Sequence, residues 1–226
     1  MIYEIAGLKV EMNPQFERLK KQSEDYRSFG EPVMLVKPHP HDEMCVAGTS
    51  EEEREYILYS AAFCRDILPF GRFFLHASAV VYKGEGYLFS APSGIGKSTH
   101  TALWRQLFPE SYILNDDKPI ILPQDKQIFV WGTPFSGKSG LHKNRKVPLK
   151  AICFLRQDIT NSIRKITQER AMALILNNTW QPKNREKMNL LLDMAEQVVA
   201  NTDIYEMGSV GDLQAARLSY DVMKGK

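Results

Sequence analysis

The stretch "SAPSGIGKSTHTALW", residues 90–104, decides the fold. Its spacing follows G-x-x-x-x-G-K-[ST], a pattern in which backbone N–H groups curve around phosphate oxygens at the start of a helix. Ala91 stands where the first glycine of that pattern is expected. Alanine fits there if its φ is negative, because glycine is needed where φ is positive or where another backbone comes close. We therefore expect this loop to bind phosphate.

The residues on either side favour phosphate binding over a purely structural turn. An apolar run ends at Ser90, and residues 97–108 have helical spacing, so the loop joins a strand to a helix, as the motif requires. Lys97 is expected to reach the β- and γ-phosphates, and the Ser98 hydroxyl to contact Mg²⁺. The predicted nucleotide-binding residues are Ala91, Pro92, Ser93, Gly94, Ile95, Gly96, Lys97, Ser98 and Thr99.

The composition is that of a globular protein with no strong overall charge. The 226 residues are 43% hydrophobic and 25% charged, and 29 basic against 27 acidic side chains leave a net charge of +2. This balance argues against nucleic acid or anionic lipid as a partner. The chain has no signal-peptide pattern and no run of the roughly 18 apolar residues that span a bilayer. We expect a cytoplasmic protein. Its composition is compatible with a monomer or a homo-oligomer.

The three cysteines lack the spacing of a metal site. Cys45, Cys64 and Cys153 are far apart in the chain and lie in no CxxC or Cys/His pair. We expect buried, reduced thiols.

The order of apolar patterns predicts an α/β fold, with a mixed β-sheet and flanking helices. Two strands around Gly7, a helix capped by Ser50 and ending near Pro69, and a hairpin over residues 73–90 precede the glycine-containing loop. Further strands are expected in residues 111–115, 118–123, 127–132, 149–157 and 204–207, and helices at about 168–178, 184–200 and from 212 onward. We expect residues 1–70 to form an N-terminal β/α segment packed on a catalytic unit, residues 71–226.

Two adjacent aspartates follow the apolar run "YILN". Transfer of a phosphoryl group to an alcohol needs a proton acceptor and a metal, and Asp116 and Asp117 offer both. Neighbouring residues at a strand end can point to different sides, one toward the metal and the other toward the acceptor. The alternative is a turn aspartate that caps local backbone. It is less favoured, because acids beside a buried strand are costly unless their charge is used.

His76 lies 21 residues before Lys97, on the first strand of the expected hairpin. Taken alone, a histidine between Leu75 and Ala77 is more typical of a satisfied core residue than of a catalytic one.

Taken together, "LHASAV", "APSGIGKST" and "LNDD" resemble the catalytic domain of the HPr serine kinase/phosphorylase family. The resemblance covers about residues 73–123 and implies a fold akin to phosphoenolpyruvate carboxykinase, with ATP and Mg²⁺ as cofactors. It implies that Asp117 is the proton acceptor that activates a substrate serine, with His76 as its neighbour. It also implies that Lys97 is the phosphate ligand and Ser98 a metal ligand. From the residues themselves, the aspartate pair supplies the other expected metal ligand, Asp116.

The chain also departs from that family. The family's second metal carboxylate lies on the strand after the aspartates, where this chain has Phe129 and Trp131 in "IFVWG". Residues 1–70 are too short to match the regulatory domain of the full-length enzymes. HPr is therefore not assumed to be the substrate.

The segment "GTPFSGKSGLHKNRKVPLK", residues 132–150, carries five positive charges and no acid. It is either a solvated basic loop or a lid whose Lys138 or Arg145 neutralises charge on the transferring phosphate. Lys138, close to Gly137 and Gly140, is the preferred lid residue. A further apolar set forms a helix face that we expect to be core, with a peptide-binding groove left open: Leu174, Ile175, Leu190, Leu191, Met194 and Val198.

These observations favour an ATP-dependent kinase that phosphorylates a hydroxyl, namely a serine of a protein or peptide. One alternative is a nucleotide-binding or nucleotide-hydrolysing regulator without a phosphorylated product. Another is a kinase for a small metabolite. No guanine-reading NKxD motif is present, since "NDDK" has the wrong order, and this argues against a GTPase switch.

Overall fold

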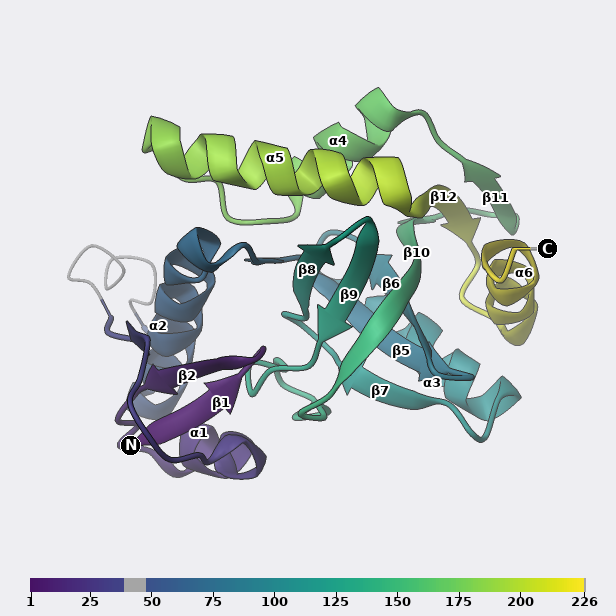
Figure 1. The fold of residues 1–226 in the computed structure, drawn as a ribbon. Helices are drawn as coiled ribbons and strands as arrows, with labels where there is room; N and C mark the ends of the chain where they lie inside the picture. The colour runs from purple at the N-terminus through teal and green to yellow at the C-terminus, as the bar shows by residue number, and fades with distance from the viewer. Residues whose placement is uncertain (39–47, 226) are drawn as a thin grey trace.

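A curled, mixed β-sheet runs through the molecule (Figure 1). The computed structural model describes residues 1–38 and 48–225, so Cys45 lies outside them. Within them the sheet has nine strands, in the order β4-β8-β9-β10-β6-β5-β7, and β12 joins β10 to β11. The strands are β4 (Phe73–Phe74), β5 (Ala77–Tyr82), β6 (Glu85–Ser90), β7 (Tyr112–Asn115), β8 (Ile120–Gln124), β9 (Gln127–Trp131), β10 (Lys146–Gln157), β11 (Ser162–Lys165) and β12 (Asp203–Ser209). The expected α/β class with a mixed sheet is confirmed.

Helices cover both faces of this sheet. Alternate residues of a strand face opposite sides, so Ala79 and Val81 pack toward α4 and α5, whereas Val80 packs toward α3 and α6. Figure 1 shows α4 and α5 together on one side of the sheet. The helices are α3 (Lys97–Leu107), α4 (Gln168–Asn177), α5 (Arg185–Asn201) and α6 (Leu213–Met223). Coverage on both faces explains why the strands read as nearly continuous apolar runs.

The apolar face of α4 and α5 is core, as expected. Ile175, Leu191, Met194 and Val198 are buried against the sheet, and Leu190 is 40% exposed at the margin. This face is covered by the protein's own sheet.

The N-terminal residues form a smaller unit with its own hydrophobic cluster. It comprises β1 (Ile2–Ile5), β2 (Leu8–Glu11), β3 (Met34–Leu35), α1 (Glu17–Gln22), α2 (Glu51–Asp66) and the short 3₁₀ turns Glu24–Tyr26 and Leu68–Phe70. The predicted cap of α2 is confirmed, because the Ser50 hydroxyl accepts a hydrogen bond from the Glu53 N–H. The cluster also includes Ile120 and Phe135, so the unit packs directly on the rest of the molecule.

The first strand of the expected hairpin is interrupted, which corrects the placement of His76. β4 pairs with β8, whereas β5 pairs with β6 and β7, so the chain changes partners at residues 75–76. The His76 N–H donates to the Asn178 carbonyl, and the Ser90 hydroxyl donates to the His76 carbonyl. His76 therefore lies in a bend between two strands, not within a strand.

The strand pairings bring three separate segments to one edge of the sheet. β5 is antiparallel to both β6 and β7, so β6 and β7 run in the same direction. Ala77 pairs with Ser90, and Ala79 pairs with Asn115. The start of β5 therefore lies beside the ends of β6 and β7. This register places His76, the glycine-containing loop and the aspartate pair together.

Two further expectations concern the thiols and the membrane. Cys64 and Cys153 are buried and free, as predicted, and burial raises the pKa of the Cys64 thiol to about 12. Among the described residues, none of the helices combines the length and the apolar character that crossing a bilayer requires.

Candidate active site

A cavity of about 590 Å³ opens at this edge of the sheet. One wall is residues 93–99, and the floor is made by His76 and the aspartate pair. Residues of α1 and α2 and residues 136–139 complete it. Most of the side chains singled out from the sequence therefore line one space, although they come from segments far apart in the chain.

The glycine loop (residues 91–96) joins β6 to α3. Gly94 and Gly96 have φ values of +84° and +109°, which is the left-handed region that favours glycine. Ala91 is buried and does not have a positive φ. The missing first glycine is therefore compatible with the loop, because that position needs no left-handed backbone.

Lys97 begins α3 and folds back over the glycine loop. Its Nζ donates a hydrogen bond to the Ala91 carbonyl at 2.8 Å, and the side chain is only 8% exposed. Burial lowers the pKa of Lys97, while Asp117 and Asp116 act against that shift. A buried ammonium close to two carboxylates is suited to an anionic ligand at the mouth of the loop.

Ser98 and Thr99 are exposed in the first turn of α3 and line the cavity. The first N–H groups of a helix have no intrahelical partner, and here no side chain caps them. This turn therefore presents backbone donors and hydroxyls to the cavity.

Asp116 is buried behind Lys97. Its Oδ1 accepts a hydrogen bond from the Ser78 hydroxyl at 2.6 Å, and that hydroxyl lies 2.8 Å from the Thr101 hydroxyl of α3. This chain of oxygens connects the aspartate to the helix that follows the glycine loop. It holds the carboxylate in one orientation.

Ser98 and Asp116 offer the oxygen ligands that Mg²⁺ prefers. Within the described residues, no three His, Cys, Asp or Glu side chains gather in a way that could hold a metal. Mg²⁺ commonly binds through one or two carboxylates together with substrate phosphates and water. The donor set therefore fits Mg²⁺ that arrives with a nucleotide rather than a resident metal centre.

Asp117 lies between His76 and Lys118. His76 Nε2 is 3.3 Å from its Oδ1, and Lys118 Nζ is 3.3 Å from its Oδ2. Burial raises the pKa of the Asp117 carboxyl, but the hydrogen bond from His76 and the charge of Lys118 outweigh it and hold the pKa below its usual value. Asp117 is therefore ionised at neutral pH.

The Asn115 side chain fixes the turn that carries both aspartates. Its Oδ1 accepts hydrogen bonds from the N–H groups of Asp117 and Lys118. Its Nδ2 donates to the carbonyl and the hydroxyl oxygens of Thr133. The Asn115 side chain therefore satisfies the backbone N–H groups of this turn, and the Asp117 carboxylate faces the cavity.

The opposite wall comes from α1 and α2, and sequence reasoning missed it. We call Arg18, Glu53 and Tyr56 the N-terminal wall. The Arg18 guanidinium pairs with Glu53 and lies over the Tyr56 ring, 3.8 Å from its centroid. Arg18 donates to the Gly137 carbonyl at 2.9 Å, and the Tyr56 hydroxyl accepts from the Gly137 N–H at 2.7 Å.

Gly137 lies directly against Asp117. Its φ is +68°, and a Cβ at this position would come within 3.2 Å of the Asp117 Cβ. The N-terminal wall therefore reaches the catalytic candidate through a residue that only glycine fits.

The charges of the basic segment lie on different structural elements. Lys138 is exposed and lines the cavity, but Lys146 and Lys150 belong to β10. Lys146 donates to Gln124, and Lys150 pairs with Glu85. Arg145 lies over the Tyr112 ring. The strand begins at Lys146, and among the five only Lys138 lines the cavity, so Lys138 remains the proposed lid residue.

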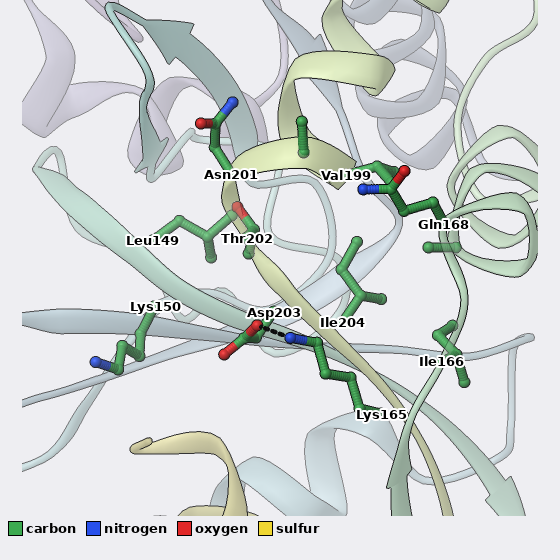
Figure 2. Close-up of a pocket in the computed structure, with 12 residues that line it drawn as sticks. Leu149, Lys150, Lys165, Ile166, Gln168, Val199, Asn201, Thr202, Asp203 and Ile204 are labelled. Atoms are coloured by element: carbon green, nitrogen blue, oxygen red, sulfur yellow. Dashed lines mark hydrogen bonds and ion pairs between the residues drawn. The ribbon is translucent and has the colours of Figure 1, made fainter. Parts of the chain in front are cut away.

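A second cavity, of about 520 Å³, lies away from the glycine loop (Figure 2). It is formed where α5 meets β12, with β10 and α4 around it. Figure 2 shows Lys165 paired with Asp203 inside it. Its charged pair is satisfied internally, so the first cavity remains the candidate active site.

Comparison with known proteins adds a family. The family model described as "SynChlorMet cassette protein ScmC" matches residues 50–207. Among solved structures, the HPr(Ser) kinase/phosphatase from Coxiella burnetii is 11% identical with a TM-score of 0.36. That match covers 67% of this chain and 99% of the other. No curated protein matches the chain significantly.

Proposed function

This chain belongs to the ScmC family, and we propose that it is an ATP-dependent kinase that transfers the γ-phosphate to a hydroxyl. The observation that carries the proposal is a single cavity in which Lys97 and Ser98 face an ionised Asp117. The first two residue types suit a phosphate chain and the third suits a proton acceptor. A serine of a protein or peptide is the proposed acceptor, following the resemblance of "LHASAV", "APSGIGKST" and "LNDD" to HPr serine kinases.

Each residue has one role in the proposed reaction. The backbone of the glycine loop and Lys97 bind the phosphates. Asp117 accepts the proton as the acceptor oxygen forms its bond to the γ-phosphorus and the bond from that phosphorus to the leaving oxygen breaks. His76 and Lys118 hold the carboxylate in place and keep it ionised. Ser98 and Asp116 would hold Mg²⁺, which supplies positive charge near the phosphates when bound.

Lys138 would add positive charge at the mouth of the cavity. It lies on the segment that Arg18 and Tyr56 hold through Gly137. An exposed lysine next to that glycine is able to reach the transferring group without displacing buried side chains.

The test is phosphoryl transfer from γ-labelled ATP with Mg²⁺ to serine-containing peptides, including peptides encoded near this gene. We expect wild-type protein to label a peptide, and Asp117→Asn to lower that rate by about 10²-fold or more. Its affinity for ATP should stay within about twofold of wild type, because the ion pairs of the Asp117 carboxylate are with His76 and Lys118 rather than with the glycine loop. Asp193→Asn, an exposed aspartate on α5, is the matched control and should keep full activity.

Two outcomes would contradict the proposal. Near-normal transfer by Asp117→Asn would remove Asp117 as the proton acceptor. Release of labelled phosphate with no labelled peptide would instead support a nucleotide-hydrolysing regulator.

A further inference from the structure

Three parallel strands end together beside the glycine loop. β10 is parallel to both β6 and β12, with Phe154 opposite Ser90 and Gln157 opposite Ser209. The residues that follow each strand therefore lie at the same edge. In α/β proteins this carboxyl edge of parallel strands is where ligands bind.

A cavity of about 320 Å³ lies at this edge, next to the active-site cavity. The two cavities share Gly94, Gly96 and Thr99, so the glycine loop separates them and belongs to both. This volume falls within the roughly 300–1,000 Å³ of small-molecule pockets. A ligand that lies across the loop would reach into both.

Arg156, which pairs with Asp158, is the one charged residue among those that line this cavity, and the rest of the lining suits an uncharged ring system. No carboxylate lines it, in contrast to the cavity that holds Asp116 and Asp117. Val210 is 46% exposed and presents apolar surface beside the partly buried Ile95. The exposed Gln157 amide offers both a donor and an acceptor for hydrogen bonds.

His100 also borders this cavity, although it is only 2% exposed. The Ser219 hydroxyl donates to the Ala216 carbonyl and lies within hydrogen-bond distance of Trp104 Nε1 and of His100 Nε2. One hydroxyl has one proton to give, so His100 must donate from Nε2. Its Nδ1 is then a buried acceptor beneath the surface of the cavity, without a hydrogen-bond partner within the described residues.

The outer wall is already ordered. Asn161 accepts a hydrogen bond from the Val210 N–H at 3.0 Å and donates to Asp212 at 2.9 Å. The Gly211 N–H donates to the Ser209 hydroxyl. A wall held in this way loses little freedom when a ligand binds.

We propose that this cavity, which we call the nucleoside cavity, holds the base and ribose of the nucleotide whose phosphates lie on the glycine loop. This inference rests on the proposed function. The nucleotide would lie across the loop, with its terminal phosphate toward Asp117 and its base between Val210 and Gln157. The active-site cavity is then left for the molecule that accepts the phosphoryl group.

Binding of ATP and of inorganic tripolyphosphate, each with Mg²⁺, tests this arrangement. Tripolyphosphate has the phosphate chain but no nucleoside. Val210→Asn removes apolar surface with little change in size or charge, so we expect ATP to bind about tenfold more weakly and tripolyphosphate to bind as to wild type. Val33→Asn, 58% exposed in the N-terminal unit, is the matched control and should change neither affinity.

A second variant examines the polar contact. Gln157→Leu removes the amide at the proposed base. The affinities for ATP, GTP, CTP and UTP should therefore become more alike than in the wild-type protein. Unchanged ATP affinity in Val210→Asn, or equal weakening of ATP and tripolyphosphate, would overturn the nucleoside cavity alone. Failure of wild-type protein to bind either compound would overturn the proposed function and this inference together.

Discussion

The two walls of the active-site cavity are built in opposite ways. One wall comes from a single run of the chain, residues 93–99, whose shape comes from positive φ values at Gly94 and Gly96 and from the start of α3. The other is assembled from α1, α2 and residues 136–139. Its two hydrogen bonds to Gly137 join residues 119 and 81 positions apart in the chain.

The shape of the first wall therefore depends on local sequence, whereas that of the second depends on tertiary packing. The glycine loop needs only its own backbone and the helix that follows. The N-terminal wall exists only when a separate hydrophobic cluster has docked on Ile120 and Phe135. We therefore expect changes in the first wall to affect the nucleotide, and changes in the second to affect the acceptor.

The largest expected effect comes from Lys97→Ala. Loss of the ammonium should lower transfer by about 10²–10³-fold and weaken ATP binding, because phosphate charge is then unopposed at the loop. Calorimetric titration with ATP and the labelled-peptide assay measure the two effects. Lys183→Ala, an exposed lysine before α5, is the control. Normal ATP affinity in Lys97→Ala would show that the loop does not hold phosphates as proposed.

The second effect concerns the stability of the protein at low pH, through His100 of α3. Burial lowers the pKa of His100 from 6.5 to about 4, so the native state resists protonation that the unfolded chain accepts. Stability should therefore fall as pH drops below 6.5 toward 4, by about 2 kcal/mol between pH 7.5 and 5. Urea unfolding at both pH values measures this change. Gln does not titrate, so the stability of His100→Gln should fall by about 2 kcal/mol less than that of wild type between these pH values. An equal loss of stability in both proteins would contradict the role of His100.

The smallest effect is expected at the N-terminal wall. Arg18→Met keeps the contact with the Tyr56 ring but removes the charge and the hydrogen bond to Gly137. We expect the KM for an acceptor peptide to rise about tenfold, with kcat and ATP affinity changing by less than about twofold. Arg185→Met, at the start of α5, is the control. An equal loss of ATP affinity would mean that the two walls do not divide their ligands.

Much of the fold follows from local patterns. The glycines at 7 and 84, the Ser50 cap and the alternation of apolar residues predict most elements within a few residues. The misses are short elements without a pattern of their own: β3 has two residues, α1 has six, and β11 has only one partly buried side chain. The break at His76 was missed for a different reason. Residues 73–82 are mostly apolar around it, and only the change of pairing partner interrupts the strand.

The site was predictable wherever it is contiguous. The glycine loop, Lys97 and the aspartate pair could be read directly, and Lys118 stood beside them in "NDDK". Ser78 and Thr101 are single polar residues in a strand and a helix, so their contact with Asp116 depends on how α3 packs. Arg18 and Tyr56 gave no signal, because an arginine in a polar segment and a tyrosine on a helix are typical of many surfaces.

The docking of the N-terminal cluster on Ile120 and Phe135 also bears on modularity. A chain cut before β4 would lose Arg18 and Tyr56, and it would expose two large side chains that are fully buried in the intact protein. The hydrogen bonds that hold Gly137 beside Asp117 would go with them. Residues 71–226 are therefore not expected to fold and function on their own, because the first seventy residues cover part of their hydrophobic surface and supply one side of the candidate site.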